Sequence, residues 1–143
     1  MILIDANVLI YAFRKDTLQH DKYLQWLKNI VNGHTMFGVS DLVLSTVVRI
    51  TTHPRIYKNP SSSREVLNFI NAVRSCPMCL TVNPGPKHWD TFSSLIESLK
   101  LIGNDIPDAY LAALAIEWDY ELVTTDQGFS RFPSLKWQHP FNQ

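Results

Sequence analysis

The chain begins with an apolar run, Met1–Ile4, that stops abruptly at Asp5. Such a short run before a polar turn is typical of a buried strand, which favours a parallel sheet covered by helices. The carboxylate of Asp5 would then lie at the carboxyl edge of the sheet, where open α/β folds keep their functional sites. Because burying an unpaired carboxylate costs free energy, Asp5 requires a partner in the folded protein.

Strand and helix signals alternate along the rest of the chain. Further strands are predicted at 80–82, at 121–124 and around Trp137. Helices are predicted from apolar spacing at 7–13, 18–31, 42–50, 63–73, 88–102 and 107–116. This alternation predicts an α/β fold in which a short parallel sheet is flanked by helices in three layers. No repeat or composition change divides the chain, so one domain is expected over residues 1–143.

Capping residues predict where several of these helices begin. Asp16 and Thr17 are the expected cap of the second helix, and Ser40 is the expected cap of the third. Leu18 in the second helix and Trp89 in the fifth occupy positions of the apolar stripes, so both are expected to face the core.

The composition limits the classes of protein that remain. A hydrophobic content of 45% argues against disorder, and 13 basic residues balance 13 acidic ones. Neutrality excludes a strongly basic nucleic-acid coat, but it allows an enzyme with a local basic patch. Cys76 and Cys79 lack a second pair that could complete a zinc site, so they are interpreted as partly buried thiols, with a redox pair as the alternative. The chain shows neither a signal peptide nor a membrane span, and a cytoplasmic location is expected.

Three acids, Asp5, Asp108 and Asp126, could meet at one edge of the sheet. Asp5 and Asp126 each follow a predicted strand, whereas Asp108 lies in the first turn of a helix. Taken singly, Asp108 is explained by the helix dipole and Asp126 by a turn. Taken together, clustered carboxylates repel one another unless a cation offsets their charge. Ligation by oxygen alone points to Mg²⁺, with Mn²⁺ as the alternative.

Four segments in order resemble the PIN-domain ribonucleases, specifically the VapC toxins of bacterial type II toxin–antitoxin pairs. The segments are Ile4–Ala12, Leu44–Arg55, Asp108–Ala115 and Thr124–Phe129, and the tail Phe132–Trp137 follows the same pattern. The resemblance covers essentially the whole chain. It implies a PIN-like domain whose activity is the Mg²⁺-dependent hydrolysis of RNA phosphodiesters.

The resemblance also assigns roles to individual residues. It makes Asp5 the first metal-binding carboxylate, Asp108 the second, and Asp126 the acid that completes or supports the site. Thr125 matches a small hydroxyl residue that would donate a supporting hydrogen bond. Asn7 fits a polar residue near the site, although capping of the first helix explains it equally well.

Two positions depart from the family pattern. Thr46 stands where many PIN domains carry a glutamate, so a second metal would be held weakly if at all. Its hydroxyl could still orient a metal-bound water. Asp105 is a candidate to compensate in part, but a helix cap is the preferred interpretation of that residue. Gly128 replaces a further acid of many relatives, at a peripheral position that suits a turn.

The resemblance further implies a homodimer that a VapB-type antitoxin neutralises. Arg49 is the first candidate for RNA contact, because it lies about one helical turn from Thr46. Weaker candidates are His53, Arg55, Lys58 and Arg64. The aromatic residues near the start of the chain could form a groove for an antitoxin peptide, but a place in the core is favoured for them: Tyr11, Phe13, Tyr23 and Trp26.

Three other functions compete with a nuclease. A phosphatase with an aspartyl nucleophile would need Asp-x-Asp, and Asn7 stands at the second position. A receiver domain would need a lysine after a late strand, and Lys136 is poorly placed for that role. A non-catalytic PIN module that binds RNA or a protein partner is supported chiefly by Thr46.

Overall fold

A five-stranded parallel sheet forms the centre of the computed structural model, which describes residues 1–142. The strands follow the order β3-β2-β1-β4-β5 across the sheet. Their bounds are β1 Ile2–Ile4, β2 Phe37–Val39, β3 Cys79–Thr81, β4 Glu121–Val123 and β5 Trp137–Gln138. In the register of the central strands, Leu3 lies between Gly38 of β2 and Leu122 of β4.

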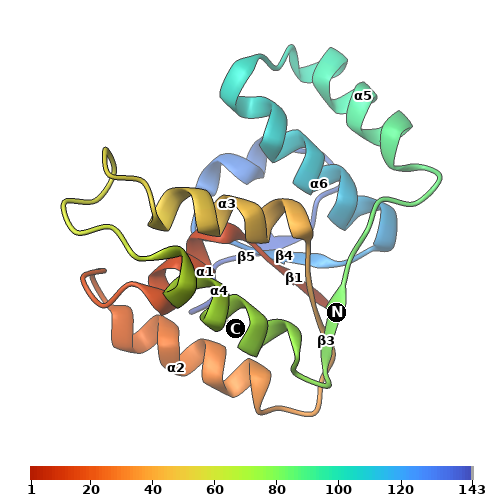
Figure 1. Cartoon of the computed structure of the whole chain (residues 1–143). Coiled ribbons are helices and arrows are strands. Elements are labelled where there is room, and N and C mark those ends of the chain that lie inside the picture. Colours follow the sequence, from red (N-terminus) through yellow and green to blue (C-terminus); the bar gives the residue numbers. More distant parts are fainter. Residues whose placement is uncertain (143) are drawn as a thin grey trace.

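Six α-helices cover the two faces of this sheet (Figure 1). Their bounds are α1 Ala6–Phe13, α2 His20–Val31, α3 Asp41–Thr51, α4 Ser63–Arg74, α5 His88–Leu99 and α6 Ile106–Trp118. Two short 3₁₀ helices, η1 Gly103–Asp105 and η2 Gln127–Arg131, complete the elements. In Figure 1, α2 and α4 lie below the sheet, and α5 and α6 lie above it. The predicted three-layer α/β fold is therefore confirmed.

The order of the connections explains the two helical layers. The chain runs from β1 through β2 to β3 in one direction, and it returns through α5 and α6 to β4 on the other side of β1. Right-handed crossovers in opposite directions put their helices on opposite faces of a parallel sheet. Helix α6 is buried on most sides, from Ala109 to Ala115, because it packs both on β4 and against α5.

Strand β2 escaped the sequence analysis, which placed no strand between the second and third helices. Three residues that include a glycine give little strand propensity. The glycine is required by packing, because a Cβ atom on Gly38 would lie 2.6 Å from the side chain of Val82. The predicted strand at 80–82 is β3, which the structure places one residue earlier, at Cys79–Thr81.

The cap predicted for α2 is wrong. The helix begins at His20, after Gln19 in a left-handed conformation with a φ of 61°, and no side chain caps it. Asp16 instead pairs with Arg14, whose buried guanidinium requires a counter-charge. Leu18 consequently lies outside the helix, with 88% of its surface exposed.

Other local predictions can be compared with the structure directly. Ser40 caps α3 as expected, because its hydroxyl accepts a hydrogen bond from the Val43 N–H at 3.2 Å. The inward orientation predicted for Trp89 is wrong, since 68% of this residue is exposed at the first turn of α5. Cys76 and Cys79 are free and partly buried, as predicted. Within residues 1–142, no helix has both the length and the apolar character that a membrane crossing requires.

Candidate active site at the carboxyl edge of the sheet

The direction in which the chain adds strands to the sheet reverses between β1 and β4, and the candidate site lies at this point. From β1 the chain proceeds to β2 on one side, whereas from β4 it proceeds to β5 on the other. The connections therefore diverge at the carboxyl ends of the two strands, which is the position where open α/β proteins bind ligands. Asp5 directly follows β1, and residues 124–126 follow β4.

Asp5 is held rigidly at the floor of this site. One carboxylate oxygen accepts a hydrogen bond of 2.7 Å from the N–H of Ala6, so that Asp5 caps α1. The other oxygen accepts a hydrogen bond of 2.7 Å from the hydroxyl of Thr124. The backbone N–H of Asp5 also donates to the carbonyl of Val123 at 3.0 Å. The orientation of this carboxylate is thus set by neutral donors from α1 and the end of β4.

Burial raises the pKa of Asp5 to about 6. The hydrogen bonds from Thr124 and Ala6 oppose this rise, and the negative charges of Asp108 and Asp126 add to it. Burial likewise raises the pKa of Asp108, and the charge of Asp126 acts in the same direction. The fold therefore brings Asp108 and Asp126 close enough for their charges to act on Asp5.

Thr124 connects the two strands of the site, and the sequence analysis did not single it out. Its fully buried hydroxyl donates to Asp5 and accepts hydrogen bonds from the Asp126 N–H at 3.0 Å and the Asn7 side chain at 3.4 Å. The side-chain oxygen of Asn7 in turn accepts from the Thr125 N–H at 3.3 Å. Asn7 therefore contacts the site, and Asp5 takes the capping role. The hydroxyl that supports Asp5 belongs to Thr124, one residue before the predicted Thr125.

Arg131 is the second residue that the sequence analysis missed. Its guanidinium reaches Asp108 at 3.2 Å and Asp105 at 3.5 Å, and it lies over the ring of Phe132 at 4.8 Å. The hydrogen bond from Arg131 lowers the pKa of Asp108, against the larger effect of burial. Asp105 occupies the N-cap position of α6, as preferred, but its side chain makes no capping hydrogen bond there and pairs with Arg131 instead.

The turn after β4 explains why glycine occupies position 128. One carboxylate oxygen of Asp126 accepts a hydrogen bond of 2.8 Å from the Gly128 N–H, which confirms the turn-forming role of Asp126. A Cβ atom on Gly128 would lie 2.8 Å from the Arg131 guanidinium and 2.9 Å from the Asp126 carboxylate. The carbonyl of Gly128 also accepts a hydrogen bond of 3.0 Å from Arg131. A larger residue here would displace Arg131 from the site.

The structure places the two other predicted site residues, Thr46 and Arg49, on α3. The hydroxyl of Thr46 donates to the carbonyl of Leu42 in its own helix at 3.0 Å, so it contributes no charge to the acids. Arg49 is exposed in the last turn of the same helix. His53 accepts a hydrogen bond of 3.0 Å from the Arg55 N–H in the loop that follows, which gives it a local structural role.

The donor chemistry of the site suits a hard divalent cation. Within residues 1–142, no group of three or more His, Cys, Asp or Glu side chains is arranged so that it could hold a metal ion. Mg²⁺ does not require such a group, because it is commonly bound by one or two carboxylates while water and substrate phosphate supply the remaining ligands. Asp5 and Asp108 provide two carboxylates of this kind, so the residues present fit such an ion.

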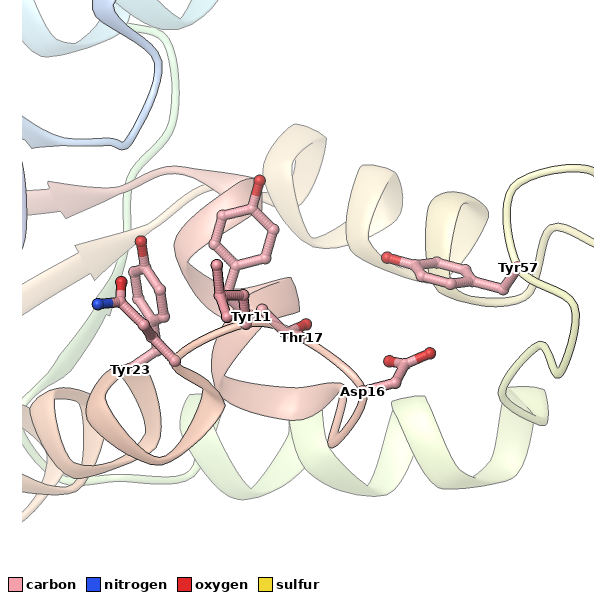
Figure 2. A pocket seen from close by; sticks show the side chains of 7 residues that line it. Tyr11, Asp16, Thr17, Tyr23 and Tyr57 are labelled. Atoms are coloured by element: carbon pink, nitrogen blue, oxygen red, sulfur yellow. The ribbon is translucent and has the colours of Figure 1, made fainter.

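A cavity of about 450 Å³ opens beside α1 (Figure 2). Its walls, named here the tyrosine pocket, are formed by Tyr11, Asp16, Thr17, Gln19, Tyr23 and Tyr57. Leu18 lies at the same cavity. The groove that the early aromatic residues might have formed is mostly core, as favoured above, since Tyr23 and Trp26 are buried and Phe13 packs against Phe69. Tyr11 is only partly buried.

The PIN domain family matches residues 2–135 of this chain. That match spans nearly the whole sheet and all of the site described above. The chain therefore belongs to the PIN domain family, as its sequence motifs indicated.

Full-length relatives narrow the resemblance within that family. A VapC ribonuclease of Mycobacterium bovis is 35% identical over 142 residues, which cover 99% of this chain and 97% of that protein. Ribonuclease VapC31 of Mycobacterium tuberculosis is 36% identical over 140 residues, covering 98% of this chain and 99% of the relative. Among solved structures, VapBC2 from Rickettsia felis, bound to a DNA fragment from its promoter, matches with a TM-score of 0.71 at 21% identity. That match covers 97% of this chain and 98% of the other, and it supports the fold.

Proposed function

We propose that this PIN domain is a Mg²⁺-dependent endoribonuclease that acts as the toxin of a type II toxin–antitoxin pair. The observation that carries the proposal is the placement of Asp5 and Asp126 after β1 and β4, joined through the Thr124 hydroxyl, with Asp108 close enough for its charge to act on Asp5. Full-length relatives at 35% and 36% identity are named ribonucleases. A catalytically silent module that binds RNA or a protein remains the second candidate, favoured by Thr46 in place of an acid.

The reaction is the hydrolysis of an RNA phosphodiester by water. Asp5 and Asp108 would hold the metal ion, which when bound polarises the phosphate and lowers the pKa of a water molecule. Thr124 keeps the Asp5 carboxylate in a fixed orientation through its 2.7 Å hydrogen bond. Asp126, whose negative charge acts on both other acids, would complete or support the metal site directly or through a water molecule. Arg49 on the exposed face of α3 would contact the RNA backbone.

The protein partner proposed for this chain is a VapB-type antitoxin. The structural neighbours from Rickettsia felis and Haemophilus influenzae are VapBC complexes, with TM-scores of 0.71 and 0.70. We further propose that the toxin is a homodimer and that the antitoxin blocks access to the acidic site.

The decisive experiment is RNA cleavage by the purified chain with Mg²⁺ or Mn²⁺, compared with the same reaction in a chelator. Cleavage should occur with metal, stop with chelator, and be absent from D5N and D108N. Arg74→Gln is a suitable control, because it breaks an exposed ion pair with Asp41 that has no part in the site. Retained cleavage in both aspartate variants would exclude the mechanism, and a folded wild type inactive on all RNA would favour the binding module.

A further inference from the structure

We propose that the tyrosine pocket binds one nucleobase of the RNA substrate next to the phosphate that is cleaved. The inference rests on the proposed function and adds a substrate subsite to it. The pocket has a volume of about 450 Å³, and three aromatic rings contribute to its walls. Aromatic side chains bind the bases of single-stranded nucleic acids by stacking, and they tolerate any base because every base has a π face.

The pocket lies on the helix face that begins at the candidate active site. Asn7 contacts Thr124 and Thr125, and Tyr11 follows it by four residues on α1. Residues four apart lie on the same face of a helix, and the rise between them is roughly 6 Å. A stacked strand rises roughly 3 Å per nucleotide, so a base one or two nucleotides from the bound phosphate would reach the pocket.

Arg14 fixes two walls of the pocket relative to each other. Its buried guanidinium stacks on the ring of Tyr57 at 3.9 Å and donates a hydrogen bond of 3.0 Å to Asp16. It also donates to the carbonyl of Asn59 at 2.8 Å and to the hydroxyl of Ser61 at 3.1 Å. The loop that carries Tyr57 and the loop that carries Asp16 are therefore joined by one cation. A pocket that is formed before binding loses less conformational entropy when a ligand enters.

Tyr57 lies on the opposite side of the pocket from the other two tyrosines (Figure 2). Its ring lies across an open space from Tyr11 and Tyr23, which stand on α1 and α2. Tyr11 and Tyr23 contact each other with their ring centroids 5.1 Å apart, so together they form one aromatic wall. Asp16 and Thr17 come from the loop between the two helices.

The charge of the pocket favours a base over a phosphate group. The hydrogen bond from Arg14 lowers the pKa of Asp16, which is therefore an anion that accepts hydrogen bonds from N–H groups and repels phosphate. Burial raises the pKa of Tyr57 and of Tyr23, so both aromatic side chains stay uncharged. Outside the pocket, the exposed Lys15 precedes Asp16 and the exposed Lys58 follows Tyr57 on the same two loops, and both suit an RNA backbone.

A side chain of a protein partner is the competing occupant. The polar groups of the pocket and its position along α1 from Asn7 favour the base.

The test combines a protein variant with a missing base. Fluorescein-labelled oligoribonucleotides of about ten nucleotides are bound to the D108N protein, and affinity is measured by anisotropy. Each position is replaced in turn by an abasic nucleotide. Tyr57→Ala should weaken binding on the order of ten-fold, whereas Tyr57→Phe should bind like its parent, because stacking on the ring is retained. At one position of the oligonucleotide, removal of the base should abolish the difference in RNA affinity between Tyr57→Ala and its parent.

Trp89→Ala is the matched control, since it removes an aromatic residue that is 68% exposed on α5, away from the pocket. It should leave RNA affinity unchanged, both for the complete oligonucleotide and for each oligonucleotide with an abasic position. Thermal unfolding of Tyr57→Ala verifies that the loop substitution leaves the protein folded.

The outcomes separate the subsite from the proposed function. If wild type cleaves RNA but no abasic position is coupled to Tyr57, the subsite is excluded while the nuclease remains. If Tyr57→Ala weakens binding of the purified antitoxin and leaves RNA affinity unchanged, the pocket belongs to the protein partner and the proposal is wrong. If wild type neither binds nor cleaves RNA, the proposed function fails and the subsite fails with it.

Discussion

Asp5 and Asp108 face the same candidate site, yet the protein holds them in different ways. Asp5 is buried and receives hydrogen bonds from two neutral donors, the Ala6 N–H and the Thr124 hydroxyl. Asp108 is 32% exposed and pairs with the cation of Arg131, which it shares with Asp105. The first carboxylate is fixed before any ligand arrives, whereas the second has a cation of the protein beside it.

The difference has a consequence for metal binding. A neutral donor orients a carboxylate without reducing its attraction for a cation by charge, but a guanidinium reduces that attraction. Asp5 therefore resembles a rigid anchor, and Arg131 acts as a counter-charge that a metal ion must compete with at Asp108. The predictions below test each half of this contrast.

Removal of either carboxylate should have the largest effect. D5N and D108N are each expected to reduce RNA cleavage by on the order of a thousand-fold or more, because the metal ion would lose one of two charged protein ligands. Initial rates at saturating Mg²⁺ measure the loss. Circular dichroism of both variants must match the wild type, and Arg74→Gln should cleave normally.

Thr124→Val tests the rigid half of the comparison. Valine keeps the shape of the buried residue but removes the donor to Asp5 and the acceptor for Asp126 and Asn7. Activity should fall about 10- to 100-fold, as is usual when a group that orients a metal ligand is lost. Thr125→Val is the control, and it should cost clearly less. Equal losses in the two variants would show that the hydroxyl on Asp5 has no special role.

The buried state of Asp5 should appear in the stability of the metal-free protein. Its folded pKa of about 6 lies above the ordinary value, so the folded protein binds an extra proton between roughly pH 4 and 6. The resulting destabilisation is complete above pH 6 and disappears as the pH falls toward 4. D5N should therefore unfold with a free energy on the order of 2–3 kcal/mol higher than wild type at pH 7.5.

Urea denaturation in chelator measures this difference. The gap between D5N and wild type should close near pH 4. A constant gap across this range would mean that the ionisation of Asp5 is not its cause.

The sequence predicted which acids lie near one another better than it predicted the hydrogen bonds around them. The motif around Asp5 and the pattern of strands and helices placed the three acids at one edge of the sheet. The hydroxyl of Thr124 could not be chosen over that of Thr125, because the choice depends on which side chain points inward where β4 ends. Arg131 was missed because it is 23 residues from Asp108 in the chain, and only the folded turn at Gly128 brings them together.

The fold shows the same limit. Ser40 and Pro107 marked helix starts because their effect is local to the backbone. Asp16 looked equally suited to a cap, but its carboxylate pairs with the buried guanidinium of Arg14 instead. Strand β2 has three residues and is stabilised by its neighbours β1 and β3, so its own sequence carries little of the signal.

Arg131→Gln tests the second half of the contrast, the counter-charge at Asp108. The loss of one positive charge beside the site should tighten Mn²⁺ binding about ten-fold at pH 8, where the carboxylates are ionised. Isothermal titration without RNA measures the affinity directly. Arg74→Gln removes the same charge elsewhere and should change affinity little. Weaker binding by Arg131→Gln would show that Arg131 mainly orients Asp108 and does not compete with the metal.

Asp105→Asn should produce the smallest effect, in the opposite direction. Asp105 shares Arg131 with Asp108, and half of its side chain is exposed. Without this carboxylate, the guanidinium would interact more fully with Asp108, and one nearby negative charge would also be lost. Both changes weaken metal binding, and a decrease of about two- to three-fold is expected for so exposed an ion pair. In the Arg131→Gln background there is no guanidinium that could interact more fully with Asp108. Asp105→Asn should therefore reduce metal affinity less in that background than in wild type. An unchanged cost in that background would mean that Asp105 acts on the metal by its charge alone, and not by drawing Arg131 away from Asp108.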